Sequence, residues 1–362
     1  MTSKKYVAWL VFVQVSLMAV NLIFWHGYAK KFLTQKDLAG TGYFLVNEFL
    51  TPDKKFPGHH VELANYLKSG KKESFDIITI GDSFSNGCAK AYYQDILVSR
   101  YGLKILNVRF RIDSCLRDLY YLIQSGLLEE FQPRLIILER VGRAVHWSLG
   151  SREISSKNVP NTPIEKFFAP KPAAKPKRTL GIFSSIMFQY NWEVFKNLFY
   201  RRIHRENLSP KVFFAELDRD LFTNKNQENL LLYYFEDFNF LKTPANIAMI
   251  NKNLNNVAGI LAEKNIKLAF MPCVDKFDLY YPYIKDKHGR PENNLFEEIR
   301  KIPDKKYIFI DTKKILREAL ALGEKDIYWI DDTHWSWRGM SIVCEKIFEA
   351  ICENFRIKAK FL

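Results

Sequence analysis

Residues 75–83 read FDIITIGDS, an apolar run that ends in a glycine, an aspartate and a serine. The β-rich part of this run, at 76–80, predicts a short buried strand. Further runs of the same kind lie at 104–108, 135–139, 267–271 and 307–310. Stretches with helical spacing of apolar residues lie between or after them, at 89–99, 118–128, 247–264, 312–322 and 340–355. Strand and helix in alternation predict an α/β fold, with a doubly wound, mainly parallel five-stranded sheet joined by right-handed crossovers.

One long stretch breaks this alternation. Residues 147–245 are rich in proline and contain the basic run PKPAAKPKR at 170–178, followed by aromatic-rich material with helical character at 183–240. We therefore expect a helical insertion between the third and fourth strands of a sheet domain that spans 75–362. Residues 27–74 are expected to form a stalk and lead-in.

The N-terminal residues indicate in which cellular compartment the protein lies. After two lysines, residues 6–25 carry no charge. At 1.5 Å per residue a helix of about twenty residues crosses the ~30 Å hydrocarbon core of a bilayer. Trp25 and His26 stand where a signal peptide has small residues for cleavage, so we expect an uncleaved single-pass anchor at 1–26 and an extracytoplasmic or periplasmic body. A buried core helix is the alternative, and lysines on both sides leave the orientation open.

The positive charge of the chain is concentrated in one region. The 362 residues carry a net charge of +14, and between residues 151 and 211 there are 12 basic and 4 acidic residues, a net +8. This stretch is interrupted by prolines and has no recognisable nucleic-acid-reading module, so we expect no nucleic-acid partner. Anionic lipid headgroups or an acidic polymer are the expected partners, and a solvated loop is the alternative.

The five cysteines show neither CxxC nor metal-ligand spacing. Their odd number leaves at least one free thiol within the chain. In an exported body, Cys88 with Cys115 is the first pair to test for a disulfide, and ordinary small buried residues are the alternative. Asp331, Asp332 and His334 lack further ligands at suitable spacing, so we expect neither a metal nor another cofactor.

Two distant motifs carry residues suited to nucleophilic catalysis. Ser83 follows the first strand, where a tight turn presents its hydroxyl at the sheet edge and backbone amides can meet an oxyanion. In YWIDDTHWSWRG, at 328–339, His334 precedes the last helix and follows Asp331 and Asp332. Turn formation and capping explain each residue alone. Together they fall at the carboxyl edge of one sheet, so we predict a Ser-His-Asp triad in which either aspartate orients the imidazole.

GDSF after the first strand and DTHW before the last helix resemble the SGNH (GDSL-like) hydrolase superfamily, in particular the branch related to alginate O-acetyltransferase. LERVGR at 138–143 and MPCVDKFDLYYPYI at 271–284 support the resemblance, which spans roughly 75–355 without the insertion. It implies a flavodoxin-like SGNH hydrolase fold. The alginate-type enzymes carry DxHW before GDS, whereas this chain has the conventional order.

Carried over residue by residue, the resemblance implies Ser83 as nucleophile, His334 as base and Asp332 as the orienting acid. Asp331 remains the competitor, because ordinary members of the superfamily use DxxH. The family's oxyanion-hole glycine is missing from NVRFRIDS at 107–114, and Glu139 and Arg140 replace its asparagine.

We therefore expect the oxyanion to be held by the Ser83 amide and by Arg140. An ion pair of Arg140 with Glu139 or a neighbouring carboxylate is the alternative. Lys276, Asp278 and Tyr280 follow the fourth strand, and we expect them to line the cleft or to form a solvated loop.

The resemblance implies a membrane-anchored O-acetyltransferase or acetylesterase that acts on a cell-surface or exported polysaccharide. It further implies a multi-span membrane acyltransferase as partner. A non-catalytic polysaccharide-binding or scaffold subunit is the alternative. A hydrogen bond between Ser83 and His334 would favour the enzyme, and a remote, enclosed Ser83 hydroxyl would favour the scaffold.

Overall fold

The computed structural model describes residues 3–27, 29, 38, 56–70, 72–86, 92–109, 115–156, 168, 185–203, 211–239 and 246–355. The basic run at 170–178 and Cys88 lie outside the described residues. The Cys115 thiol is buried and free, which agrees with the alternative of an ordinary small buried residue and not with a Cys88–Cys115 disulfide.

The central sheet has six strands: β1 Val61–Glu62, β2 Ile77–Gly81, β3 Ile105–Arg109, β4 Leu135–Val141, β7 Lys267–Cys273 and β8 Ile308–Phe309. They lie in the order β1-β3-β2-β4-β7-β8, and all neighbours are parallel. The prediction of an α/β fold with a mainly parallel sheet is confirmed. The five expected strands run 2-1-3-4-5, one of the common orders of doubly wound sheets.

The sixth strand comes from the segment that we expected to be a stalk. β1 pairs with β3, and α2 (Leu63–Ser69) follows it directly. Leu63 and Tyr66 are buried in the main hydrophobic core. Part of the lead-in therefore belongs to the sheet domain, because a two-residue strand and one short helix leave too little periodicity to be recognised in the sequence.

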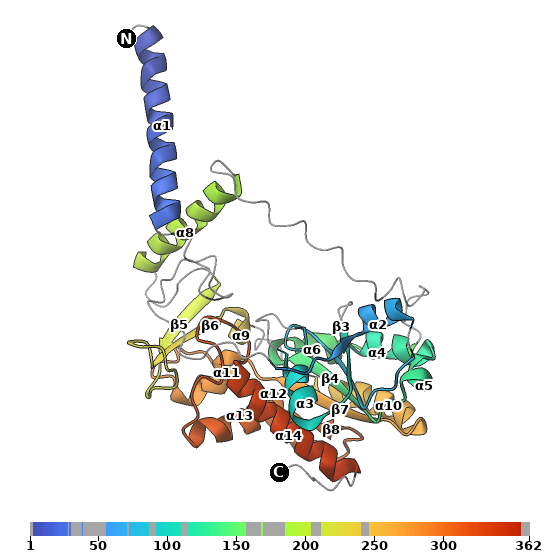
Figure 1. Ribbon diagram of the computed structural model, residues 1–362. Helices are drawn as coiled ribbons and strands as arrows, with labels where there is room; N and C mark the ends of the chain where they lie inside the picture. The colour runs from blue at the N-terminus through green and yellow to red at the C-terminus, as the bar shows by residue number, and fades with distance from the viewer. Residues whose placement is uncertain are drawn as a thin grey trace.

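Helices cover both faces of the sheet (Figure 1). On one face, α14 (Trp337–Phe355) contacts α3 (Tyr93–Tyr101) and α13 (Thr312–Ala321). On the other, α10 (Ile247–Glu263) contacts α6 (Gly142–Leu149) and α12 (Leu295–Lys301). The remaining elements of the body are α4 Cys115–Gln124, α5 Leu127–Phe131, α11 Lys276–Tyr280 and the 3-10 turn Tyr281–Tyr283. Right-handed crossovers place successive helices on opposite faces when the strand order reverses.

The insertion is helical only in part. Helix α8 spans Ser185–Ile203, but β5 (Val212–Glu216) and β6 (Leu230–Tyr234) form an antiparallel pair, followed by α9 (Glu236–Asn239). The prediction of helical material at 183–240 was therefore wrong for the two segments that form β5 and β6. β5 (VFFAE) and β6 (LLLYY) each contain two aromatic residues, which favour strands, and pairing two separate segments is a tertiary event.

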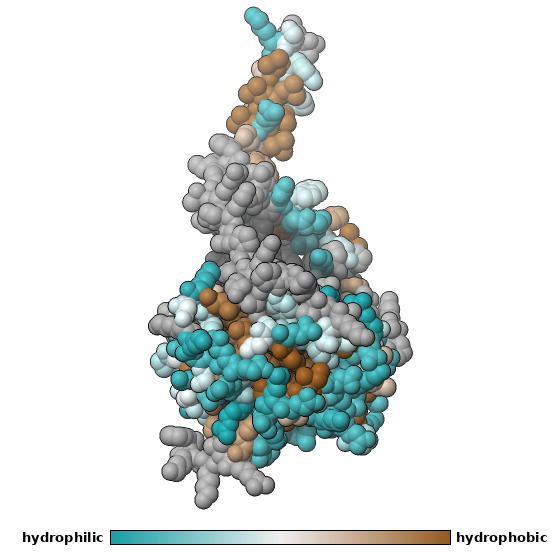
Figure 2. Space-filling model, turned by 90° about the vertical axis from the view of Figure 1, so that its right-hand side faces the viewer, coloured by the Kyte–Doolittle hydropathy of each residue, from teal (hydrophilic) through white to brown (hydrophobic). Residues whose placement is uncertain are grey.

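Helix α1 (Ser3–Gly27) stands apart from the body. It is long and apolar enough to cross a membrane, and an 18-residue window of it has no buried residue. In Figure 2 it projects as a mainly apolar rod above a body whose visible face is mostly hydrophilic. Only Trp25, near its C-terminal end, is buried. The helix is compatible with the predicted anchor, and its topology stays a prediction.

Candidate active site

Ser83 lies in the turn that follows β2, at the carboxyl edge of the sheet. Asn86 closes this turn: its N–H donates to Ser83 O at 3.3 Å, and its side-chain Nδ2 donates to Gly81 O at 3.0 Å. The Ser83 side chain is partly exposed. The turn thus presents the serine hydroxyl at the edge of the sheet.

His334 lies in a short hairpin directly before α14, which we call the His334 hairpin (residues 328–335). Tyr328 and Trp335 form an antiparallel bridge across it, and Trp329 N donates to His334 O at 3.3 Å. The Phe84 ring packs against the imidazole, with ring centroids 4.9 Å apart. These contacts hold the imidazole beside the serine turn.

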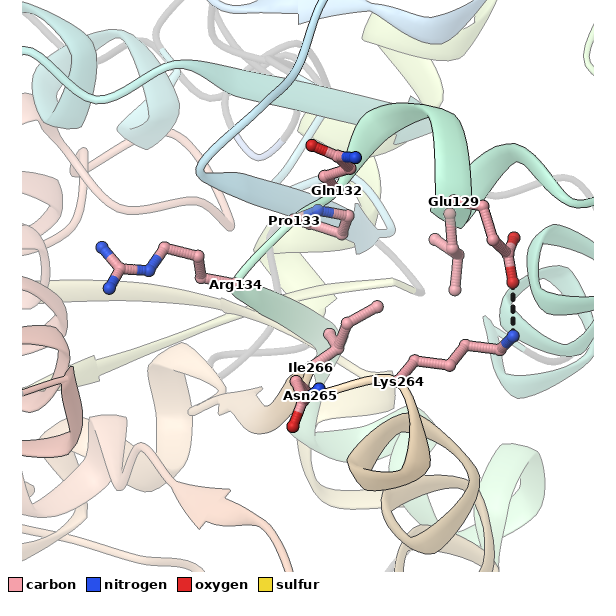
Figure 3. A pocket seen from close by; sticks show the side chains of 8 residues that line it. Glu129, Gln132, Pro133, Arg134, Lys264, Asn265 and Ile266 are labelled. Atoms are coloured by element: carbon pink, nitrogen blue, oxygen red, sulfur yellow. Dashed lines mark hydrogen bonds and ion pairs between the residues drawn. The ribbon is translucent and has the colours of Figure 1, made fainter.

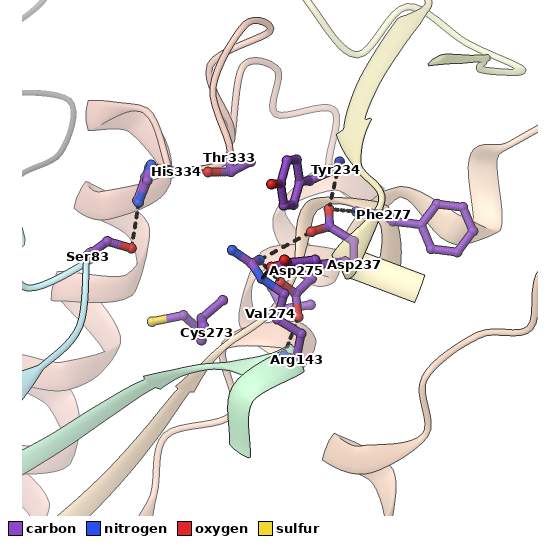
Figure 4. A network of polar contacts seen from close by, with 12 residues as sticks. Ser83, Arg143, Tyr234, Asp237, Cys273, Val274, Asp275, Phe277, Thr333 and His334 are labelled. Atoms are coloured by element: carbon purple, nitrogen blue, oxygen red, sulfur yellow. Dashed lines mark hydrogen bonds and ion pairs between the residues drawn. The ribbon is translucent and has the colours of Figure 1, made fainter. Parts of the chain in front are cut away.

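Ser83, His334 and Asp332 form one hydrogen-bonded series. His334 Nε2 lies 2.8 Å from Ser83 Oγ, and Figure 4 shows the imidazole pointing at the hydroxyl. His334 Nδ1 lies 2.6 Å from Asp332 Oδ1, which also accepts from His334 N at 3.0 Å. Because an ionised carboxylate only accepts, Nδ1 carries the proton and Nε2 accepts from the serine hydroxyl. Such a series can activate a serine as a nucleophile.

The competing carboxylate, Asp331, is fully buried. Its backbone carbonyl accepts a hydrogen bond from Leu38 N at 2.9 Å. The Nδ1–H of His334 is a single donor, and Asp332 Oδ1 occupies it at 2.6 Å. Of the two aspartates, Asp332 therefore has the geometry of the orienting acid.

Arg140 forms an ion pair with Asp82 and not with Glu139. Its Nη1 lies 3.4 Å from Asp82 Oδ2, and its guanidinium lies 4.6 Å from the centroid of the Trp147 ring. The alternative that we named for Arg140, an ion pair with a neighbouring carboxylate, is thus present, and that carboxylate belongs to Asp82, directly before Ser83. Asp82 Oδ2 also accepts from Val141 N at 2.9 Å. These two contacts join the serine turn to the end of β4.

Glu139 is a buried carboxyl group next to the serine turn. Its Oε2 accepts from Ser85 N at 3.1 Å, and its Oε1 accepts from Cys273 Sγ at 3.4 Å. Burial, and then the charge of Asp82, raise the pKa of Glu139 well above its ordinary value. A neutral acid at this position holds the serine turn without an unpaired buried charge.

Gly81 permits this close approach of Glu139. A Cβ at position 81 would lie 2.8 Å from Glu139 Cβ and would overlap the Oε2 of Glu139 and the Oγ of Ser85. We expect Gly81→Ala to lower the free energy of unfolding by about 2 kcal/mol or more. Urea unfolding of the full chain in detergent measures this loss.

Gly259→Ala is the matched control, because a Cβ there meets nothing within 4 Å in helix α10. This variant should be up to about 1 kcal/mol more stable than the wild type, since alanine favours helix over glycine. Equal unfolding free energies for the two variants would contradict the steric argument.

Lys276 and Tyr280 do not line a cleft, contrary to our expectation. Lys276 is 1% exposed, and its ammonium donates at 2.7 to 3.1 Å to three backbone carbonyls of the His334 hairpin, those of Trp329, Ile330 and Asp332. Tyr280 is fully buried, and its hydroxyl accepts from Tyr328 N at 3.4 Å. Both side chains therefore support the His334 hairpin from within the core. Asp278 is likewise fully buried.

A buried charge network lies near the triad (Figure 4). Arg143, at the start of α6, forms an ion pair with Asp275, and its Nη1 lies 3.2 Å from Asp237 Oδ1. Burial raises the pKa of Asp275 to about 7; the Arg143 charge opposes this shift and Asp237 adds to it. The network joins the ends of β4 and β7 to the insertion. Sequence reasoning missed it, because its members are far apart in the chain.

A second polar network supports the serine turn from the side of β3. Asn107 Nδ2 donates to Ser85 O at 3.2 Å, and its Oδ1 accepts from Thr79 Oγ1 at 2.8 Å. Gln94 Nε2 also donates to Ser85 O, at 3.0 Å. Sequence reasoning missed these residues too, although a polar Asn107 inside the apolar run ILNVR was an available signal.

His60 extends this network into the lead-in segment. Its Nδ1 lies 2.7 Å from Asp95 Oδ1, and its Nε2 lies 3.1 Å from Glu62 Oε1, which also accepts from Asn107. Burial alone would lower the pKa of His60, but the hydrogen bonds with Asp95 and Glu62 outweigh it and raise the pKa to about 9. The imidazole is therefore a cation between two carboxylates at neutral pH.

This raised pKa predicts a loss of stability in alkali. The stabilisation is complete below the ordinary pKa of histidine, 6.5, and disappears as the pH rises through about 9. A shift of this size corresponds to roughly 3 kcal/mol. Urea unfolding across this pH window should show the decline, and His60→Gln should flatten it. A wild-type profile that stays level would contradict the assignment.

One surface depression lies away from the triad. It has a volume of about 570 Å³ and is lined by residues that include Gln132, Arg134 and Ile266, beside the Glu129–Lys264 ion pair (Figure 3). These residues precede β4 and β7, so the depression opens at the amino edge of the sheet. Ser83 lies at the carboxyl edge, and the depression has no part in its site.

The chain matches no protein-family model, and a search of curated proteins finds no significantly similar sequence. Functional inference for this chain therefore depends on the geometry of the site.

Proposed function

We propose that this protein is a membrane-anchored serine O-acyltransferase or esterase of the SGNH type. The observation that carries the proposal is the series of hydrogen bonds from Ser83 through His334 to Asp332, with distances of 2.8 and 2.6 Å. Ser83 is a half-buried residue rather than a fully buried one, which also favours an enzyme over the non-catalytic scaffold alternative.

The chemistry follows from the positions of these groups. Ser83 Oγ attacks the carbonyl carbon of an acyl ester while His334 Nε2 accepts the hydroxyl proton. Collapse of the tetrahedral intermediate breaks the bond to the leaving oxygen, which takes the proton from the imidazolium. An acceptor hydroxyl or water then attacks the acyl carbon and gives its proton to His334 Nε2. The bond between that carbon and Ser83 Oγ breaks, and Oγ takes the proton back from the imidazolium. Asp332 holds the tautomer and stabilises the imidazolium.

The developing oxyanion needs donors near Ser83. The Ser83 N–H has no hydrogen-bond partner among the described residues, so it is one candidate donor. We propose Arg140 as a second donor to the oxyanion. Its guanidinium would then contact both Asp82 and the oxyanion. The ion pair of Arg140 with Asp82 places this guanidinium next to the serine turn.

The proposed substrate is an acetyl ester or acetyl acceptor on a cell-surface or exported polysaccharide, and the proposed donor-side partner is a multi-span membrane acyltransferase. Both come from the resemblance of GDSF and DTHW to the alginate acetylation branch. The apolar helix α1 supports a site of action at a membrane.

The test is to incubate the full chain in detergent with an acetyl donor and candidate oligosaccharides and to follow product mass. Transfer adds an acetyl group to the sugar, and hydrolysis releases acetate. Ser83→Ala should abolish both products. Tight oligosaccharide binding without any Ser83-dependent product would instead establish the scaffold alternative.

A further inference from the structure

Helix α8 carries an exposed row of large apolar side chains, which we call the α8 stripe. Its members are Trp192, Phe195, Phe199 and Ile203, each between 55% and 62% exposed. They recur at spacings of three and four residues, so they share one side of the helix. The Trp192 and Phe195 rings stack with centroids 6.1 Å apart. Water is a poor environment for a contiguous row of this kind.

A different side of α8 packs against the end of α1. Met187 and Val194 are buried in a small core with Trp25 of α1, separate from the core of the body. Asn191 Nδ2 donates to Asn21 O at 3.0 Å and to Asn21 Oδ1 at 2.6 Å. Figure 1 shows α8 crossing α1 at its C-terminal end.

This contact sets the depth of α8 in a membrane. If α1 spans the bilayer, its C-terminal end at Trp25 lies where the hydrocarbon gives way to headgroups. A helix packed against that end lies at the same level. Tryptophan and phenylalanine are the side chains that interfacial helices bury at this boundary. The α8 stripe therefore has the composition and the position of a membrane-interface surface.

The charge around the stripe fits the same environment. Lys196 and Arg202 are exposed on α8, and the stretch from 151 to 211 that contains α8 carries 12 basic against 4 acidic residues. Anionic headgroups attract basic residues placed at the level of the phosphates.

We propose that α8 lies in the membrane interface, with the α8 stripe inserted among the lipids of the leaflet from which α1 emerges. The occupant of the stripe is thus the bilayer itself rather than another protein. The anchor and α8 together would hold the body at two points. This inference rests on the proposed membrane anchor and is independent of the triad.

The experiment places single nitroxide labels on α8 of the full chain, with one copy per lipid nanodisc that contains anionic lipid. Cysteines replace the stripe residues Phe195 and Phe199 in one set, and the exposed polar residues Gln189 and Glu193 in the matched set. Cys88→Ser and Cys352→Ser are present in every sample, and Cys115, Cys273 and Cys344 are buried.

Collisions with O2, which concentrates in lipid, are compared with collisions with a water-soluble nickel chelate. The ratio of the O2 collision rate to the nickel-chelate collision rate should be roughly tenfold higher at the stripe positions than at the polar positions. Equal ratios at all four positions would overturn the proposal. Stripe labels shielded from both reagents would also overturn it, because a protein contact then covers the stripe. Ester hydrolysis by the same samples reports separately on the triad.

Discussion

Ser83→Ala and His334→Ala are each expected to lower kcat for hydrolysis of an activated acetyl ester by at least about a thousandfold. The reason is that Ser83 Oγ and His334 Nε2, 2.8 Å apart, act as one unit. Loss of either the nucleophile or its base removes the same step, so the double variant should be hardly slower than either single one.

Ser85→Ala is the matched control for this prediction. Ser85 lies in the same turn, but its side chain is buried and its Oγ lies 3.4 Å from Tyr93 OH. This variant should retain turnover within about tenfold of the wild type, since it removes one buried hydrogen bond and no reacting atom. Thermal unfolding of every variant checks that the fold survives. Wild-type turnover in Ser83→Ala or His334→Ala would refute the triad.

Asp332→Asn should lower kcat/KM for the same ester by about a thousandfold to ten-thousandfold. The asparagine amide can donate to His334 Nδ1, which favours the tautomer with the proton on Nε2. A protonated Nε2 can no longer accept the serine proton. The substitution also removes the carboxylate charge that stabilises the imidazolium. Steady-state kinetics at a single pH measures the effect.

Asp331→Asn is the informative partner of that substitution, because the two residues are adjacent and chemically equal. Asp331 is fully buried, so this change should affect the stability of the His334 hairpin more than the chemical step, and kcat should fall by less than about tenfold. A larger loss in Asp331→Asn than in Asp332→Asn would assign the orienting role to Asp331.

Much of the sheet was predictable because its signal is local. Each of the five expected strands is an apolar run of strand length, and each buried run, such as 135–139, needs both faces covered. The same reasoning predicted that the site lies at the carboxyl edge of the sheet. In a parallel sheet the carboxyl ends of all strands meet at one edge, so Ser83 and His334 were expected close together although 251 residues separate them.

Elements with a weak local signal were missed or misassigned. β1 has two residues, and β5 and β6 form their ladder with each other rather than with the central sheet. Aromatic residues with no clear alternation are compatible with helix or strand, and tertiary pairing decides between the two.

The sequence by itself determined the alternation of strands and helices, the apolar N-terminal helix, and the pairing of a serine motif with an aspartate-histidine motif. These follow from hydrophobic periodicity, which each segment carries within itself. Only the tertiary structure decided the partners of the long charged side chains. Arg140 pairs with Asp82, and Lys276 donates to the His334 hairpin from inside the core. A flexible cationic side chain reaches any acceptor within several ångströms, so burial and the positions of distant backbone carbonyls choose its partner.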